Sequence, residues 1–234
     1  NDLVTANEVS NNVSVLLNNG DGTFATKVEY AAGHRPRSVF IADLDGDEDN
    51  DLAVANQGFD FISDPPSNTV SVLLNNGDGT FTNATESSGF SNLKGTGLGV
   101  FISDLTGDNL PDIFIANDAM PNRLWVNQGN GTFVDEAMNR NIAMDDSGVA
   151  KAGMGATPVD IDQDGDFDVF VANIYGESDS FYRNDGDYFI DITRRSGLSA
   201  ETRAYTRWGI AFVDFNNDGL LDLYETTGGV MSGP

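Results

Sequence analysis

Cysteine is absent from this chain of 234 residues, and histidine occurs once, as His34. The absence of cysteine excludes disulfide bonds and thiolate metal sites, so stability has to come from packing and from bound ions. A single histidine excludes a histidine pair for zinc, and we find neither a nucleophile motif nor a phosphate-cradling glycine loop. Apart from aspartate, residue types with catalytic potential are sparse. We therefore expect a protein that is not an enzyme.

Positive charge is also scarce. Twelve lysine and arginine residues stand against 37 acidic residues, which gives a formal net charge of −25. This charge argues against nucleic acid or an anionic membrane surface as a partner. No apolar run is long enough to span a membrane, so we expect no membrane insertion. The length is ordinary for one all-β domain, which we predict to cover residues 1–234.

Aspartate is abundant in four acidic loops of nine residues each: loop 1 (43–51), loop 2 (104–112), loop 3 (160–168) and loop 4 (214–222). In every loop an oxygen-bearing side chain stands at positions one, three, five and nine. These residues are Asp43, Asp45, Asp47 and Asp51; Asp104, Thr106, Asp108 and Asp112; Asp160, Asp162, Asp164 and Asp168; and Asp214, Asn216, Asp218 and Asp222. Such spacing gathers hard oxygens around one point, which favours Ca²⁺ because this ion takes six to eight oxygen ligands. The sequence predicts up to four calcium ions.

The acidic loops belong to a repeat. A strand-like segment starts at the ninth position of each loop, at residues 51, 112, 168 and 222, and a fifth copy starts at Asp2. The spacing between copies therefore runs from 49 to 61 residues, within the range of one propeller blade or a similar β unit. Each copy also holds an Asn-rich turn that ends in phenylalanine, most clearly at residues 18–24, 75–81 and 127–133 and more loosely at 184–189. Glycine and asparagine supply the positive φ angles that tight hairpins need, and we expect the phenylalanine to begin a new strand.

Each repeat reads as four short strands rich in β-branched and aromatic residues. The expected fold is all-β: a β-propeller or propeller segment of four-stranded antiparallel blades, with the acidic loop between the first and second strands. The chain starts on a second strand and ends after another, so the repeats do not close cleanly. We expect either part of a larger propeller or edge-strand pairing between molecules, which yields a filament when the contact is head-to-tail.

These residues resemble the FG-GAP/VCBS calcium-binding repeats, found in the integrin α-subunit propeller and in ASPIC/UnbV-type secreted proteins. The glycine-rich segments at 97–100, 153–158 and 209–212 match the first strand of that family. The acidic loops match its DxDxDGxxD loop, and the Asn-x-Gly-Asp-Gly-Thr-Phe segments match its turn. The resemblance implies a backbone carbonyl ligand at position seven, from Asp49, Leu110, Asp166 and Leu220. Loop 2 departs from the family pattern at Thr106, so we expect it to be the weakest site.

Several alternatives stay open. Residues 214–225 also satisfy the EF-hand pattern, although that motif needs flanking helices. The loops are solvated turns if they hold no metal. An insertion at 57–67, which carries Phe59 and Phe61, is either a ligand-contacting loop or a plain surface loop. We interpret Trp125 and Trp208 as core residues.

The predicted function is an extracellular or cell-surface calcium-binding scaffold for adhesion or ligand binding, because millimolar free calcium exists outside cells. Its partner would be a protein or a carbohydrate, with self-assembly as a further possibility. The rival class is a lectin or a carbohydrate-active enzyme similar to polysaccharide lyases on a calcium propeller.

Overall fold

The computed structural model describes residues 2–58, 70–90 and 94–229. Three sheets are complete four-stranded antiparallel meanders in chain order. Their strands are β4 (Pro36–Ala42), β5 (Asp51–Asn56), β6 (Val70–Asn75) and β7 (Phe81–Asn83); β8 (Gly97–Ser103), β9 (Asp112–Asn117), β10 (Arg123–Asn127) and β11 (Phe133–Asp135); and β12 (Gly153–Val159), β13 (Asp168–Asn173), β14 (Ser180–Asn184) and β15 (Phe189–Asp191). The predicted all-β fold of four-stranded blades is confirmed.

Two further sheets have fewer strands. The first holds β1 (Leu3–Asn7), β2 (Asn12–Leu16) and β3 (Val28–Ala31), which correspond to the second, third and fourth strands of a complete blade. The last holds β16 (Thr206–Val213) and β17 (Asp222–Gly228), which correspond to the first and second strands. The predicted strand phase at both ends is therefore confirmed for the described residues. Before β16 lie a short helix, α1 (Leu198–Glu201), and a 3₁₀ turn (Thr202–Ala204) that the sequence did not indicate.

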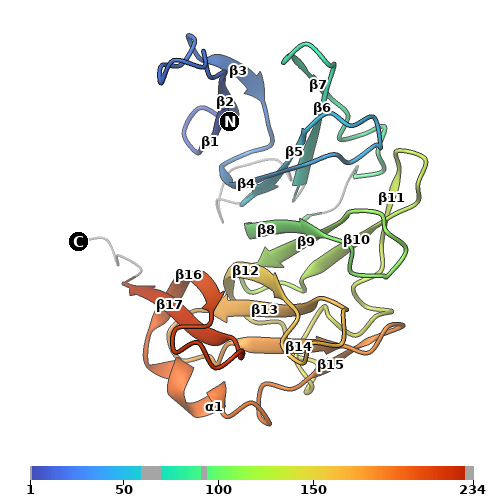
Figure 1. Cartoon of the computed structure of the whole chain (residues 1–234). Helices are drawn as coiled ribbons and strands as arrows, with labels where there is room; N and C mark the ends of the chain where they lie inside the picture. The colour runs from blue at the N-terminus through green and yellow to red at the C-terminus, as the bar shows by residue number, and fades with distance from the viewer. Residues whose placement is uncertain (1, 59–69, 91–93, 230–234) are drawn as a thin grey trace.

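The sheets follow one another around an arc, with the first strands β4, β8, β12 and β16 on its inner side (Figure 1). Sheets β1–β3 and β16–β17 form the two ends of the arc (Figure 1). The hydrophobic core is divided among the junctions between neighbouring sheets. One cluster joins β4–β7 to β8–β11 through residues such as Val72, Val100 and Trp125, and similar clusters fill the other three junctions. Stacking of adjacent blades thus buries the faces that a single sheet would leave exposed.

The second strands lie deepest in the sheets. Every residue of β5, β9 and β13 is buried, and these strands have the near-continuous apolar run of a segment covered on both faces. Each begins with the ninth-position aspartate of an acidic loop. The fold therefore anchors one end of loops 1, 2 and 3 in the protein interior, whereas Asp222 of loop 4, at the start of β17, is partly buried.

The structure decides three of the sequence interpretations, and a fourth lies outside the described residues. Phe24 was predicted to start a strand, but it forms only an isolated bridge to Asn18, is 39% exposed, and the strand begins later, at Val28. Trp208 was interpreted as a core residue, and this is wrong because it is 41% exposed on the inner side of the arc. Trp125 is buried at 2% exposure, as predicted. Phe59 and Phe61 of the insertion lie outside the described residues.

Candidate metal centres

The four acidic loops connect first to second strands, as predicted, and they share one backbone conformation. Positions four and six of every loop have positive φ. These residues are Gly46 and Glu48, Gly107 and Asn109, Gln163 and Gly165, and Asn217 and Gly219. Each loop thus places one glycine and one non-glycine residue in the left-handed region, where glycine carries no steric cost. The two reversals turn the chain tightly around the side chains at positions one, three and five.

The aspartate at position one organises the turn by accepting backbone hydrogen bonds from residues three to five positions ahead. In loop 1 the two carboxylate oxygens of Asp43 accept the N–H groups of Gly46 (2.7 Å) and Glu48 (3.0 Å). In loop 4 those of Asp214 accept the N–H groups of Asp218 (3.1 Å) and Gly219 (2.8 Å). Asp104 and Asp160 do the same in loops 2 and 3. Side chain–backbone bonds of this kind shape the loops in the protein alone.

The aspartate at position five fixes the second half of the loop. Its carboxylate accepts the N–H of position seven at 2.8 or 2.9 Å in all four loops. The position-seven residue, whose carbonyl is the predicted ligand, is therefore held at a defined place beside the position-five carboxylate. No side chain is required at position seven for this bond, which is consistent with leucine there in loops 2 and 4.

In loops 1, 2 and 3 the aspartate at position nine is buried and is held by both of its oxygens. Asp51 accepts the N–H of Leu44 and of Asn75, each at 2.8 Å. Asp112 and Asp168 repeat this pattern with position two of their own loop and with the last residue of the third strand. Burial raises the pKa of Asp51, Asp112 and Asp168 to about 6, against the lowering effect of the two N–H donors. These side chains join the loop to two strands, a role that loop spacing alone did not reveal.

The loops differ in how closely their carboxylates approach one another. Oxygens of Asp43, Asp45 and Asp51 in loop 1 lie within 4.8 Å of one another, and so do those of Asp160, Asp162 and Asp164 in loop 3. Burial, followed by the Asp47 and Asp43 charges, raises the pKa of Asp45. A donor set of crowded, hard carboxylate oxygens fits a divalent cation such as Ca²⁺, which would offset the repulsion. These two clusters could therefore hold a metal ion.

In loops 2 and 4 the third position is not a carboxylate. The Thr106 hydroxyl oxygen of loop 2 is shielded from solvent. In loop 4 the Asn216 amide donates to the Asp218 carboxylate at 2.9 Å, and its oxygen accepts the Asp218 N–H at 2.8 Å. Both loops keep three predicted carboxylate ligands, at positions one, five and nine. The side chain at position three, Thr106 or Asn216, is neutral, so the attraction of these loops for a cation is weaker than that of loops 1 and 3.

The EF-hand alternative for residues 214–225 is wrong. This segment runs from the end of β16 into β17, so strands flank it where an EF-hand needs helices. Glu225, the twelfth residue, lies in β17 near the buried Arg207, whose Nε is 3.9 Å from the Glu225 carboxylate. The same Nε donates to Asp179 at 2.6 Å. Glu225 is thus part of a buried charged cluster with Arg207 and Asp179 and is separate from loop 4.

The Asn-rich turns of sheets β8–β11 and β12–β15 are also linked to the acidic loops. The Asn127 side-chain amide donates to the Pro111 carbonyl of its own blade (3.2 Å) and to the Leu44 carbonyl of the preceding blade (3.1 Å). Asn184 makes the equivalent bonds to Phe167 (3.2 Å) and Leu105 (3.1 Å). We call this arrangement the asparagine latch. It couples the loop of one blade to the third strand of the next, and the recurring asparagine at the start of each turn was its only signal in the sequence.

Comparison with known families agrees with this repeated architecture. The model of the FG-GAP-like repeat matches residues 1–54, 59–115, 104–171 and 160–225, which together cover most of the chain. The chain belongs to the FG-GAP-like repeat family. The matched segments 104–171 and 160–225 hold an acidic loop near each end, whereas 1–54 and 59–115 hold one near the C-terminal end alone.

Two curated relatives of this FG-GAP-repeat chain are vertebrate proteins named cartilage acidic protein 1. The human protein is 29% identical over 168 residues, which is 68% of this chain and 24% of the relative. The mouse protein is 30% identical over 128 residues, which is 55% of this chain and 19% of the relative. The chain thus spans less than a quarter of the length of these relatives.

One solved structure found in the structural comparison is a lectin from Agrocybe aegerita, described as recognising non-reducing terminal N-acetylglucosamine. It is 20% identical with a TM-score of 0.47, and the match covers 97% of this chain and 54% of the lectin. No helix in the described part of the chain is long and apolar enough to cross a membrane.

Proposed function

We propose that this FG-GAP-repeat chain is an extracellular, non-catalytic binding scaffold whose blades are stabilised by calcium. The observation that carries the proposal is the convergence of three carboxylates within 4.8 Å in loop 1 and again in loop 3. Calcium there would be held by side chains at positions one, three, five and nine and by the position-seven carbonyl. The ion would offset carboxylate repulsion and fix the loop that joins first and second strands.

The chemistry of the loops supports a structural role for the ion. The carboxylates at positions one, five and nine already accept backbone N–H groups within their own blade. Groups that are engaged in this way hold the backbone and are poorly placed to transfer protons to a substrate. The extracellular setting follows from the calcium: loops of this type match millimolar free calcium, which is present outside cells.

Calcium titration of decalcified protein tests the proposal. We expect heat of binding in calorimetry and a rise in the unfolding temperature with calcium, because a ligand at about 100 times its Kd stabilises the folded state by about 2.7 kcal/mol. The double variant Asp43→Asn/Asp45→Asn should lose part of this rise. The matched control Asp187→Asn, an exposed acid between β14 and β15, should keep all of it. Absence of both heat and a thermal shift would contradict the proposal.

Self-assembly is a second candidate, favoured by the two incomplete sheets. Among the described residues, β1 and β17 each pair with a neighbouring strand on one side only. The open side of β1 is where a complete blade carries its first strand, and the open side of β17 is where a complete blade carries its third strand. Asp222 accepts the Phe215 N–H at 3.0 Å, and its counterparts in the complete sheets accept an additional third-strand N–H. Strand addition from another molecule would supply such a donor.

Light scattering at increasing protein concentration tests self-assembly. We expect the mean mass to rise with concentration, and a change of Thr226 to proline in β17 to reduce this rise, because proline lacks a backbone N–H and is poorly tolerated within a paired strand. A constant monomer mass at high concentration would overturn this second candidate and would leave the calcium scaffold unaffected.

A further inference from the structure

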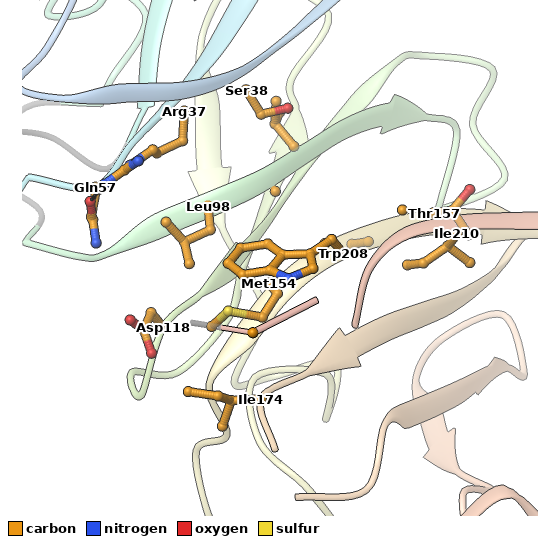
Figure 2. A pocket seen from close by; sticks show the side chains of 16 residues that line it. Arg37, Ser38, Gln57, Leu98, Asp118, Met154, Thr157, Ile174, Trp208 and Ile210 are labelled. Atoms are coloured by element: carbon orange, nitrogen blue, oxygen red, sulfur yellow. Dashed lines mark hydrogen bonds between the residues drawn. The ribbon is translucent and has the colours of Figure 1, made fainter. Parts of the chain in front are cut away.

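The inner strands β4, β8, β12 and β16 line a hollow of about 740 Å³ (Figure 2). Each of these strands has a β-bulge near its start, because the pairing register shifts between Pro36 and Ser38, between Gly97 and Gly99, between Gly153 and Gly155, and between Arg207 and Ile210. A bulge inserts an extra residue and re-aims its side chain. The bulge residues include Arg37, Leu98, Met154 and Trp208, and all four line the hollow.

The backbone around these bulges is closely packed. A Cβ atom on Gly155 would lie only 2.4 Å from the Trp208 carbonyl oxygen, and one on Gly99 would lie 3.0 Å from the Gly155 Cα. The inner strands therefore approach one another through glycine, which fixes the positions of the bulges. The four side chains that the bulges present differ in chemistry. Varied side chains on a rigid, repeated support are the arrangement expected of a binding site.

The wall of the hollow is of mixed polarity, and one part of it is aromatic. Leu98, Met154 and Ile174 line the hollow together with the Trp208 indole, and Figure 2 shows Leu98 and Met154 beside the indole and Ile174 beyond Met154. The indole packs against Gly228, where an added Cβ would lie 3.2 Å from the indole Nε1. Trp208 is nevertheless 41% exposed, whereas Trp125 is 2% exposed. The hollow thus offers a supported aromatic surface to a ligand.

The two charged residues at the hollow, Arg37 and Asp118, differ in their contacts. Arg37 is already neutralised, because its Nη1 donates to Glu8 at 2.7 Å and its Nε donates to Gln57 at 2.8 Å. Asp118 lines the same hollow, and no ion pair involves it in the described residues. Burial, followed by the Glu177 charge, raises the pKa of Asp118, which is the response of a carboxylate without a cationic partner.

We propose that this hollow binds a lysine or arginine side chain presented by a peptide segment of a partner protein. Trp208 would contact the cationic group through its ring face, Asp118 would neutralise it, and Leu98, Met154 and Ile174 would pack against the aliphatic stem. The net charge of −25 favours the approach of a cation. An anionic group would be repelled by Asp118, and Arg37 could not compensate because it already contacts Glu8 and Gln57. This inference rests on the proposed function in treating the chain as a binding scaffold, and it adds the class of ligand.

The test uses calcium-loaded protein and three acetylated, amidated pentapeptides of glycine with arginine, lysine or norleucine at the centre. Because Trp125 is buried, a change in tryptophan fluorescence on binding reports on Trp208. We expect saturable binding of the arginine and lysine peptides that weakens with added salt. The norleucine peptide should bind at least about fivefold more weakly, because it lacks the cation–π and ionic contacts.

Two variants locate the site, and calorimetry measures their affinity for the arginine peptide. Asp118→Asn preserves the shape of the side chain and should weaken binding about tenfold, since it removes a charge-assisted contact. Trp208→Leu should weaken binding about fivefold, since it removes the aromatic face. The controls Tyr188→Ala and Asp187→Asn, an exposed aromatic residue and an exposed acid in the turn between β14 and β15, should leave it unchanged.

Three outcomes would overturn the inference: no peptide binding, equal binding of the norleucine peptide, or unchanged affinity in Asp118→Asn. Binding of a neutral saccharide that displaces the arginine peptide and is insensitive to Asp118→Asn would also overturn it. The calcium response separates this failure from that of the scaffold proposal. A normal calcium-induced thermal shift without peptide binding rejects the peptide site alone, whereas peptide binding without any calcium response rejects the calcium scaffold alone.

Discussion

At the scale of single residues, the ninth-position aspartates have two tasks. Their spacing in the sequence indicated a metal ligand, and the structure adds a pair of backbone hydrogen bonds to the carboxylates of Asp51, Asp112 and Asp168. One donor of each pair lies 15 to 24 residues further along the chain, in the third strand. Its position depends on sheet register, so loop spacing alone could not reveal it.

A change of Asp168 to asparagine tests this second task without metal. The amide would place an NH₂ group against one of the two backbone donors, Ile161 N–H or Asn184 N–H, which leaves a buried donor unsatisfied. We expect the free energy of unfolding to fall by about 1 to 3 kcal/mol. Urea denaturation in the presence of a chelator measures the loss.

The matched variant Asp222→Asn should cost less, because one backbone N–H, that of Phe215, is bonded to this carboxylate in the described residues. Similar losses in the two variants would show that the buried pair of hydrogen bonds in Asp168 is unimportant.

At the scale of strands and loops, most of the repeat could be predicted from the sequence. The strand-forming segments carry β-branched and aromatic residues, and the glycine and asparagine turns mark the hairpins, so the elements of a blade were identifiable. The asparagine latch was not, because Asn127 contacts Leu44, 83 residues earlier in the chain. The delayed start of β3 was also missed, since Phe24 has the same local sequence as Phe81 but a different environment.

The asparagine latch predicts different costs for two equivalent residues. Asn127→Ala removes two hydrogen bonds to carbonyls, one of them across the blade junction, whereas the Asn75 side-chain amide donates to one carbonyl, that of Asn50, at 3.2 Å. We expect Asn127→Ala to lower the free energy of unfolding by about 1 kcal/mol more than Asn75→Ala, the usual net value of one hydrogen bond. Thermal denaturation of both variants provides the comparison, and equal losses would argue against coupling across the junction.

At the scale of the whole molecule, what the sequence could not supply is the convergence of distant elements. Trp208 looks like a core residue within its strand, and only the arc of inner strands shows that it faces the hollow. The other repeats have Val54, Ile115 and Val171 at the position of Glu225. The charge state of Glu225 depends on Asp179 and Arg207, which lie in other elements. Burial, followed by the Asp179 charge, raises the pKa of Glu225 to about 8.

This shift predicts a pH dependence of global stability. The folded protein holds a proton on Glu225 that the unfolded chain, with a carboxyl pKa near the ordinary value of about 4.3, releases at lower pH. Stability from this group is therefore fully present below the unfolded pKa and is lost as the pH rises toward 8. In chelator, we expect the unfolding temperature of Glu225→Gln to fall less between pH 5 and 8.5 than that of the parent protein, because only the parent loses this contribution as the pH rises from about 4.3 to about 8. The exposed control Glu201→Gln should follow the parent, and parallel curves for Glu225→Gln would refute the assignment.

The asparagine latch has a consequence for how such chains vary in length. At the two junctions where the latch is observed, the turn of one blade supplies the donor and the acidic loop of the preceding blade supplies the acceptor. A unit that carries both groups can therefore join a similar unit on either side. Duplication or deletion of a whole unit would leave no donor or acceptor stranded inside the array. The number of repeats can therefore change without a change in the hydrogen bonds between neighbouring blades, and arrays of different length can use the same asparagine latch.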